Sequence, residues 1–299
     1  MKIAIIGAGA IGSLLGALLK REGFDCILIG RKNHVDTIMK NGLSISGSDE
    51  FNIDIDAFCD PLYAKDSDIF IITTKAYDTR NAIHEIFPYI DDNNIVMSLQ
   101  NGAGNIEEIS KLVNKKQILG AITSIGAFVE APGRIQYRGK GTTIIGSASN
   151  NKKKAIEIID IFNKAQIKTQ FSEDIYRDIW SKVIINSGIN TIASILDNEN
   201  GVLLDKNLME IVREVTNEGK IILQKEGVEI SEDIFDTTVE IIKNTSKNIN
   251  SMLLDLRKGK RTEIDYISGK IVELGNKLDI PAPYNKTLLN MIKYKENEC

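Results

Sequence analysis

A glycine-rich turn near the N-terminus constrains the fold of this chain more than any other feature. Residues Gly7–Gly12 read Gly-Ala-Gly-Ala-Ile-Gly, follow the apolar run Ile3–Ile6 and open an apolar helical pattern. In such a unit the first glycine permits a tight turn, the second lets backbone approach a pyrophosphate, and the third lets the helix pack on the strand. The helix N-terminus then offers N–H groups to the phosphates. The motif predicts dinucleotide contacts from Gly7, Ala8, Gly9, Ala10, Ile11 and Gly12; the alternative is a glycine turn that binds no ligand.

Arg31 extends this prediction to the choice of cofactor. It lies 19 residues beyond Gly12, just after the second apolar run, where an NAD enzyme carries an acidic residue for the ribose 2′-hydroxyl. An arginine there can pair with a 2′-phosphate, and Lys32 adds positive charge. The sequence therefore favours NADP(H) over NAD. The alternative is a solvated arginine in a surface loop.

Apolar runs alternate with helical patterns through the first 171 residues. Near-continuous apolar runs are typical of parallel strands buried on both faces, and the alternation predicts a Rossmann-type α/β sheet. The expected strands are 3–6, 26–29, 69–73, 95–99, 123–129, 134–138 and 142–146, and the expected helices are 10–21, 79–87, 104–113 and 151–165.

Helical periodicity replaces this pattern from about residue 174. The expected helices are 175–196, 205–226, 232–245, 248–258 and 263–278. We therefore expect two domains: residues 1–173 as the NADP-binding domain, and residues 174–299 as an all-helical domain for substrate and catalysis.

Composition limits the binding partners and the cellular location that we expect. The 299 residues carry a formal charge of −4, which excludes a basic field for nucleic acid, and no stretch is apolar enough to span a membrane. Three cysteines without paired spacing indicate free thiols and a cytoplasmic protein, and no metal-binding spacing is present. The glycines in the N-terminal apolar run favour a strand, turn and buried helix over a signal peptide.

A polar stripe lies on an otherwise apolar helix of the second domain. Lys182, Asn186 and Asn190 recur every four residues and so share one helix face. Asparagine is a poor residue for a helix interior, and a solvated face would more often carry Glu, Lys or Gln. The stripe indicates a hydrogen-bonding surface directed at a ligand. The alternative is a partly exposed helix in which the asparagines have no function.

With these features the chain resembles the ketopantoate reductase (2-dehydropantoate 2-reductase) family, almost from end to end. The motifs that carry the resemblance are Gly7–Gly12 with Arg31, Lys75 in Thr-Thr-Lys, Gln100-Asn101-Gly102, the Lys182 stripe, Asn200-Gly201, Ser251-Met252 with Asp255, and Thr262–Tyr266.

The resemblance implies a role for each matching residue. Lys182 matches the catalytic proton donor, and Asn101 matches a residue between nicotinamide, substrate and lysine. Lys75 and Glu263 match residues around the cofactor and the polar network of the active site, so Asn101 and Glu263 count as both catalytic and cofactor-binding. The implied substrate-binding residues are Asn186, Asn190, Asn200, Asn248 and Ser251.

Each of these matches also has an ordinary structural explanation. Glu263 could be a carboxylate favoured in the first turn of a helix, with Thr262 and Asp265 as a capping box. Asn101-Gly102 could be a plain turn, Lys75 a solvated lysine at a strand end, and Ser251 an ordinary helix serine.

The resemblance implies reduction of ketopantoate to pantoate with NADPH, a step of pantothenate and coenzyme A synthesis. The expected partner is a small 2-keto acid, with no nucleic acid or membrane, and the chain is either a monomer or a homodimer. Two alternatives are another dehydrogenase of the same two-domain plan, of the opine or polyol-phosphate type, and a non-catalytic NADP-binding sensor.

Overall fold

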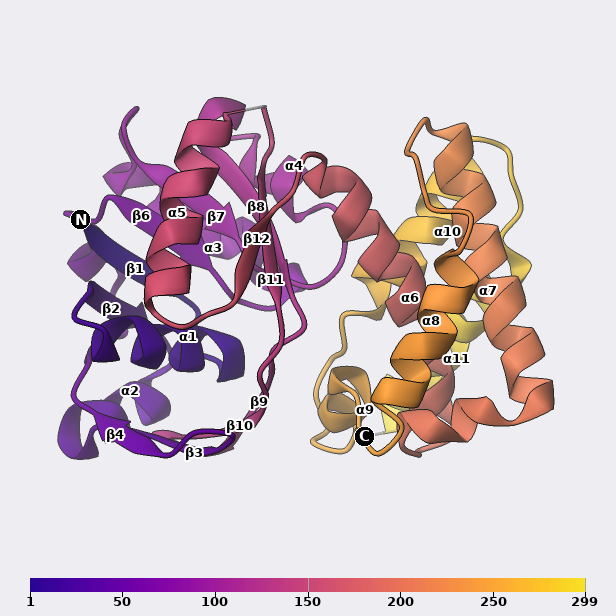
Figure 1. Cartoon of the computed structure of the whole chain (residues 1–299), viewed down its shortest axis with the longest axis horizontal. Helices are drawn as coiled ribbons and strands as arrows, with labels where there is room; N and C mark the ends of the chain where they lie inside the picture. Colours follow the sequence, from indigo (N-terminus) through magenta and orange to yellow (C-terminus); the bar gives the residue numbers. More distant parts are fainter. Residues whose placement is uncertain (150, 299) are drawn as a thin grey trace. The chain divides into compact units, whose positions relative to one another are not determined.

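The computed structural model describes residues 1–149 and 151–298, which fall into two units (Figure 1). The first unit comprises Met1–Gln100 and Asn105–Ile175 and contains both sheets. The second comprises the short segment Asn101–Gly104 and the helical chain from Tyr176 on. The α/β class and the helical C-terminal part are therefore as predicted. The grouping of Asn101–Gly104 with the second unit was not predicted.

The main sheet of the first unit has eight strands in the order β12-β11-β8-β7-β6-β1-β2-β5. The strands are β1 (Lys2–Ile6), β2 (Asp25–Ile29), β5 (Asp56–Phe58), β6 (Ile69–Ile72), β7 (Ile95–Ser98), β8 (Ile118–Thr123), β11 (Thr143–Ser147) and β12 (Thr169–Phe171). All neighbours are parallel except β11 and β8. Strands β2 and β5 are added on one side of β1 and strands β6, β7 and β8 on the other, so the strand order reverses between β1 and β6. Dinucleotides bind at such a point in this class of sheet.

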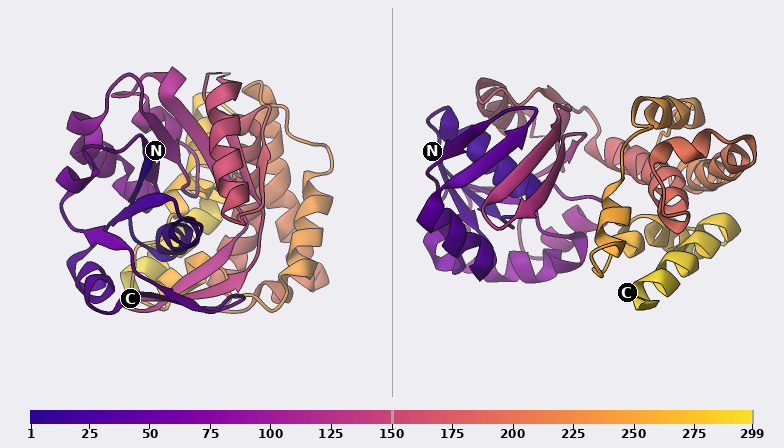
Figure 2. Two further views of the ribbon diagram at one scale, coloured as in Figure 1. Left: turned by 60° about the vertical axis from the view of Figure 1, so that its left-hand side comes forward. Right: turned by 90° about the horizontal axis from the view of Figure 1, so that it is seen from below.

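Helix α1 (Ala10–Arg21) lies between this sheet and a second one of four strands, β4-β3-β10-β9. The strands of the second sheet are β3 (Leu43–Gly47), β4 (Phe51–Ile53), β9 (Gly126–Ala131) and β10 (Arg134–Gly139). Figure 2, left, views α1 almost end-on, with this sheet beneath it. Contact on both sides explains why the helix is buried from Gly12 to Leu19 and carries so few polar residues.

The other α-helices in the described part of the first unit are α2 (Lys32–Asn41), α3 (Thr79–Ile86), α4 (Asn105–Ile109) and α5 (Lys152–Lys164). The prediction of one strand over 123–129 was wrong, since β8 ends at Thr123 and β9 begins at Gly126. Helix α2 and strands β3, β4, β5 and β12 were not predicted, because they are short or carry few apolar residues.

The second unit is built on α6 and α7, which approach each other closely. Its helices are α6 (Ile175–Ile195), α7 (Lys206–Lys225), α8 (Ile234–Asn244), α9 (Ser251–Leu256), α10 (Ser268–Lys277) and α11 (Pro283–Glu298). A Cβ at Gly219 on α7 would come within 2.9 Å of Ile184 on α6, so glycine allows the contact. Helix α7 also packs on α8, α10 and α11. No helix in the described part of the chain is long and apolar enough to cross a membrane.

The predicted helix over 263–278 is interrupted. A 3-10 helix, Ile264–Tyr266, precedes α10, and the break at Ile267 separates them with φ −109° and ψ −99°. Helix α11 was not predicted. Only Asn285, Leu288 and Ile292 are buried among its described residues, which leaves little helical periodicity in the sequence.

Candidate functional site

The glycine turn is held against the end of β6 by close backbone contacts. Gly7 has φ +107°, and a Cβ there would lie 2.7 Å from the backbone nitrogen of Thr74. A Cβ at Gly12 would lie 2.3 Å from the Gly7 carbonyl oxygen and 2.4 Å from Thr73 Oγ1. The Thr73 hydroxyl in turn donates to the Gly7 carbonyl at 2.7 Å. Both glycines are therefore required by the packing of the protein itself.

Gly9 has no such reason to be glycine. A Cβ there would meet only the Gly7 carbonyl oxygen, at 4.0 Å, and the backbone is extended. Gly9 is the N-cap of α1, no side chain caps the helix, and its first turn holds no acidic residue. The open space in front of an uncapped helix N-terminus fits the phosphates of a dinucleotide, because the dipole and N–H groups there favour an anion.

Arg31 lies two residues after the end of β2, in the short connection to α2, of which it is the N-cap. Its side chain is 88% exposed, and its guanidinium lies 3.8 Å from the carboxylate of Asp78. Lys32, the next residue, pairs with Asp36 at 3.1 Å. Lys75 is the N-cap of a short 3-10 helix, Ala76–Asp78, in the loop after β6. The glycine turn follows β1, Arg31 follows β2 and Lys75 follows β6. All three therefore lie at the carboxyl ends of neighbouring parallel strands.

The second unit brings Lys182, Asn101 and Glu263 together from three separate parts of the chain. The Lys182 ammonium on α6 donates to Asn101 Oδ1 at 3.1 Å. The amide nitrogen of Asn101 donates to the Glu263 carboxylate at 3.5 Å. Asn101 therefore lies between a cation and an anion, with its carbonyl toward the first and its amide toward the second.

The position of Asn101 depends on the glycine that follows it. Gly102 has φ +83°, and a Cβ there would lie 2.6 Å from the Cβ of Tyr266. Ala103 donates its N–H to the Tyr266 carbonyl at 2.9 Å. The segment Asn101–Gly104 is thereby held on the 3-10 helix that follows Glu263. The Asn-Gly pair is a turn, as the structural alternative supposed, and it also places an amide beside Lys182.

Burial gives Lys182 unusual acidity for a lysine. Loss of solvation lowers its pKa from the ordinary value to about 8, and the negative charge of Glu263 opposes this shift. Glu263 itself is buried. An ammonium with a pKa near 8 is mostly protonated at pH 7 and releases its proton far more readily than an exposed lysine.

The two asparagines of the stripe carry amides that the protein does not use. Asn190 is buried and Asn186 is half-buried, and neither side chain has a hydrogen-bond partner among the described residues. Both amides are therefore available to donate hydrogen bonds to a ligand and to accept them from it. The stripe therefore has the character of a binding surface, with Lys182 at its N-terminal end.

Asn200, by contrast, is already bonded within the protein. Its amide nitrogen donates to the Thr245 hydroxyl at 3.1 Å, and its carbonyl accepts from Asn250 at 3.3 Å. Asn250, which sequence reasoning missed, also caps α9 by accepting from the Leu253 N–H at 3.0 Å. An asparagine just before a helical pattern is the signal that could have revealed this cap.

The structure places Asn248 and Ser251 in the same region. Asn200 donates its backbone N–H to the Asn248 carbonyl at 3.0 Å, and both Asn248 and Ser251 are exposed. Ser251 is the first residue of α9. The backbone and side-chain bonds of Asn200 thus connect the turn after α6 to the segment that carries Asn248 and Ser251.

Comparison with known proteins assigns the family. The family model "Ketopantoate reductase PanE/ApbA" matches residues 3–150, and its C-terminal counterpart matches residues 174–296. The chain belongs to the ketopantoate reductase family. The 2-dehydropantoate 2-reductase of Pyrococcus abyssi is 42% identical over 298 residues, which cover 99% of this chain and 98% of the relative.

Solved structures agree with this assignment. The PanE/ApbA family ketopantoate reductase from Ralstonia eutropha JMP134 superposes with a TM-score of 0.93 at 29% identity, covering 100% of this chain and 99% of that one. D-mandelate dehydrogenase, solved with NADH and anilino(oxo)acetate, gives a TM-score of 0.94 at 28% identity with the same coverage. The family fold is therefore similar to that of a dehydrogenase with a different substrate.

The glycine geometry predicts opposite outcomes for two neighbouring substitutions. Gly12→Ala forces a Cβ against backbone and should cost about 1–3 kcal/mol of unfolding free energy. Gly9→Ala meets no atom closer than 4.0 Å and should cost less than about 1 kcal/mol. Urea unfolding of both variants measures the difference. Equal losses would contradict the assignment of packing to one glycine and open space to the other.

Proposed function

We propose that the chain reduces ketopantoate (2-dehydropantoate) to pantoate with NADPH. The observation that carries the proposal is a lysine of lowered pKa at the N-terminal end of a helix face whose two asparagine amides have no hydrogen-bond partner among residues 1–149 and 151–298. The curated relatives named 2-dehydropantoate 2-reductase, with identities of up to 42% over the full chain, support this substrate. The reaction belongs to pantothenate biosynthesis, and we propose that it takes place in the cytoplasm.

The residues of the first unit fit NADP(H). In this proposal residues 1–173 hold the cofactor and residues 174–299 supply substrate contacts and the acid. The N–H groups after Gly9 would receive the pyrophosphate, and Arg31 would pair with the 2′-phosphate. Its present partner, Asp78, is 3.8 Å away and leaves the guanidinium mostly exposed, so a phosphate can replace it. Lys75, Asn101 and Glu263 are proposed as further cofactor contacts.

Lys182 is proposed to protonate the alkoxide that forms from the ketone. When bound, NADPH supplies the hydride for the carbonyl carbon. The ammonium of Lys182 stabilises negative charge on the carbonyl oxygen and then delivers a proton to it. Asn101 keeps the ammonium in place through its 3.1 Å bond. Glu263 raises the pKa of Lys182 and so helps the lysine to regain a proton after each turnover.

The substrate contacts proposed for the second unit are polar and neutral. Asn186 and Asn190 offer free amide groups one and two helical turns beyond Lys182. Asn248 and Ser251 offer exposed polar groups, and Asn200 holds their segment by its own hydrogen bonds. Donors of this kind can bind the carboxylate and hydroxyl groups of a small hydroxy-keto acid.

The similarity to D-mandelate dehydrogenase favours one other function, reduction of a different 2-keto acid. Steady-state oxidation of NADPH and NADH with ketopantoate, pyruvate, 2-ketoisovalerate, oxaloacetate and phenylglyoxylate separates the two. The proposal requires the highest kcat/KM for ketopantoate with NADPH. A preference for another keto acid would assign the chain to that substrate, and tight NADPH binding without turnover would make it a sensor.

Arg31→Ala should weaken binding of NADPH far more than binding of NADH, because only NADPH carries the 2′-phosphate. A charged hydrogen bond is worth about 1.5–3 kcal/mol, or about tenfold to a hundredfold in affinity. Titration of cofactor fluorescence measures both dissociation constants, and NADH serves as the internal control. An equal loss for both cofactors would remove Arg31 from the 2′-phosphate site.

Lys182→Ala should lower kcat by about 10²–10⁴, the usual effect of removing a general acid. NADPH binding should persist, since the glycine turn and Arg31 are unchanged, and the variant should remain folded. Added primary amines should restore part of the rate. If kcat falls less than about fivefold and amines have no effect, another group delivers the proton.

The pH dependence of reduction should reveal the lysine directly. Lys182 is protonated below its pKa of about 8, so kcat/KM should fall as the pH rises through that value. Glu263 raises the pKa of Lys182, and Glu263→Gln should therefore move the alkaline limb to lower pH. Glu232→Gln is the matched control, because Glu232 is exposed and pairs with Lys220. An alkaline limb that stays in place in Glu263→Gln would contradict the coupling.

A further inference from the structure

A buried glutamine, Gln100, joins the two ends of the loop that follows β6. Its amide nitrogen lies 3.0 Å from the Thr74 carbonyl oxygen at the start of the loop and 2.8 Å from the Thr79 hydroxyl at the end. The Thr74 hydroxyl and the Lys75 carbonyl are also within reach, at 3.2 and 3.5 Å. Gln100 is only 7% exposed. The side-chain amide of Gln100, which follows β7, therefore holds together the two ends of the loop after β6.

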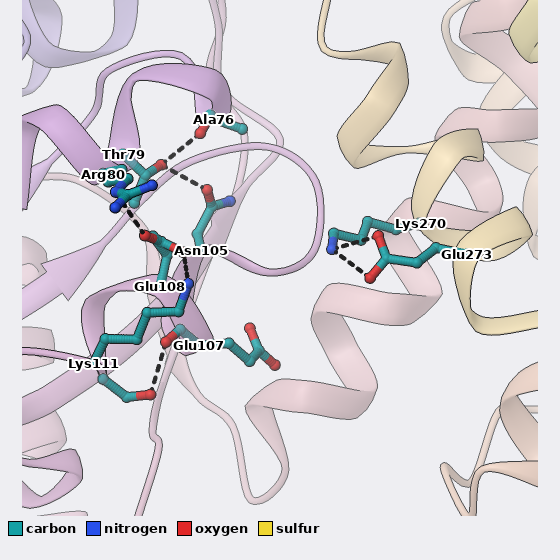
Figure 3. A network of polar contacts seen from close by, with 10 residues as sticks. Ala76, Thr79, Arg80, Asn105, Glu107, Glu108, Lys111, Lys270 and Glu273 are labelled. Carbon is teal, nitrogen blue, oxygen red and sulfur yellow. Dashed lines mark hydrogen bonds and ion pairs between the residues drawn. The ribbon is translucent and has the colours of Figure 1, made fainter. Parts of the chain in front are cut away.

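The orientation of this amide is fixed by its partners. Ser98 donates its hydroxyl to Gln100 Oε1 at 3.0 Å, which leaves the amide N–H groups directed at the loop. The Thr79 hydroxyl, which accepts from Gln100, lies 2.8 Å from the Ala76 carbonyl oxygen and 2.8 Å from Asn105 Oδ1. Figure 3 shows Thr79 between these two residues. The network needs a donor toward the loop and an acceptor toward Ser98, and among uncharged side chains of this length only glutamine supplies both.

The loop that Gln100 closes carries the groups proposed to receive the cofactor. Thr73, at its beginning, donates its hydroxyl to the Gly7 carbonyl at 2.7 Å and so joins it to the glycine turn. Lys75 lies within it, and Asp78, near its end, lies 3.8 Å from Arg31. The position of the loop thereby affects both the phosphate turn and the arginine at the end of β2.

We propose that Gln100 is a positioning residue for NADPH, which holds the loop Thr74–Asp78 in the form that receives the cofactor. This inference rests on the proposed function for the identity of the cofactor. Gln100 acts through Thr74 and Thr79, and no contact of its own with the cofactor is required. Without its amide, the Thr74 carbonyl loses a donor and the loop samples other conformations. The binding of NADPH then has to select the competent form, which lowers the apparent affinity.

The experiment compares Gln100→Met with Gln117→Met. Methionine preserves the length of the side chain and removes the donor and the acceptor. Gln117 is the matched control because it is equally buried, at 7%, and also donates to two backbone carbonyls, those of Asp91 and Asn94, at 2.6 and 3.1 Å. Those carbonyls precede β7, away from the loop. Both variants should lose stability in thermal unfolding, but only Gln100→Met should raise the dissociation constant for NADPH, by about tenfold.

A second pair of variants tests the same loop at its other end. Thr79→Ser keeps the hydroxyl that accepts from Gln100 and should bind NADPH as the wild type does. Thr79→Val removes it and should weaken binding in the same direction as Gln100→Met, which also decides the matter if Gln100→Met does not fold. The wild-type chain is measured beside them with ketopantoate.

The outcomes separate this inference from the proposed function. Wild-type turnover of ketopantoate together with unchanged NADPH affinity in Gln100→Met and Thr79→Val would overturn the inference alone. A loss of affinity as large in Gln117→Met as in Gln100→Met would also overturn it, because general destabilisation would then explain the effect. A wild-type chain that binds NADPH tightly but does not reduce ketopantoate would overturn the proposed function and leave the Gln100 comparison valid. A wild-type chain that binds no NADPH would overturn both.

Discussion

The contact between the glycine turn and the end of β6 is the constraint on which the first unit depends. Gly12 lies so close to the Gly7 carbonyl and to Thr73 that no side chain fits, and the Thr73 hydroxyl bonds to the same carbonyl. The contact fixes where α1 begins relative to the sheet. It also fixes the loop after β6, because that loop starts at Thr74. The glycine turn and the start of the loop that carries Lys75 are thus placed by the same close contacts.

In the second unit, two opposing effects set the pKa of Lys182. Burial alone would lower the pKa of Lys182 and favour its neutral form, whereas a full ion pair with a carboxylate would raise the pKa and make the proton harder to release. Asn101 is bonded to both Lys182 and Glu263, and the negative charge of Glu263 raises the pKa of the lysine against the effect of burial. The resulting pKa of about 8 lies near the pH at which a general acid is most effective.

The sequence predicted those parts of the fold that have strong periodicity or a specific motif. The glycine turn, β1, β2, β6 and β7 were predicted because parallel strands buried on both faces are almost wholly apolar. Strand β8 was not recognised because it contains Gly120, which pairs with Gly146 of β11 and weakens the strand pattern. The predicted strand over 123–129 therefore ran across the boundary between β8 and β9. Helix α2 buries only His34, Val35 and Ile38, too few residues for a helical pattern to stand out.

The residues of the candidate site also differ in how far the sequence could predict them. Lys182, Asn186 and Asn190 could be predicted because helical spacing alone puts them on one face. The partners Asn101 and Glu263 lie 81 residues before and 81 after Lys182, and only the family resemblance indicated them. Asn250 could have been recognised as a helix cap, but its bond to Asn200 could not, and Gln100 could not be assigned a role, because these partners lie 21 to 50 residues away in the sequence. Whether such a residue binds a ligand or positions a loop depends on tertiary contacts.

The neutrality of the proposed substrate surface follows from the position of Lys182. An arginine or lysine in place of Asn186 or Asn190 would bind a keto acid carboxylate more strongly, but a second cation on the same helix face would lower the pKa of Lys182 further. A smaller fraction of the lysine would then carry the proton that it has to deliver. A carboxylate in those positions would raise the pKa of Lys182 and repel an anionic substrate. Amides avoid both effects, because they bind carboxylate and hydroxyl groups through hydrogen bonds and carry no charge. The pKa of Lys182 is then set by burial and by Glu263.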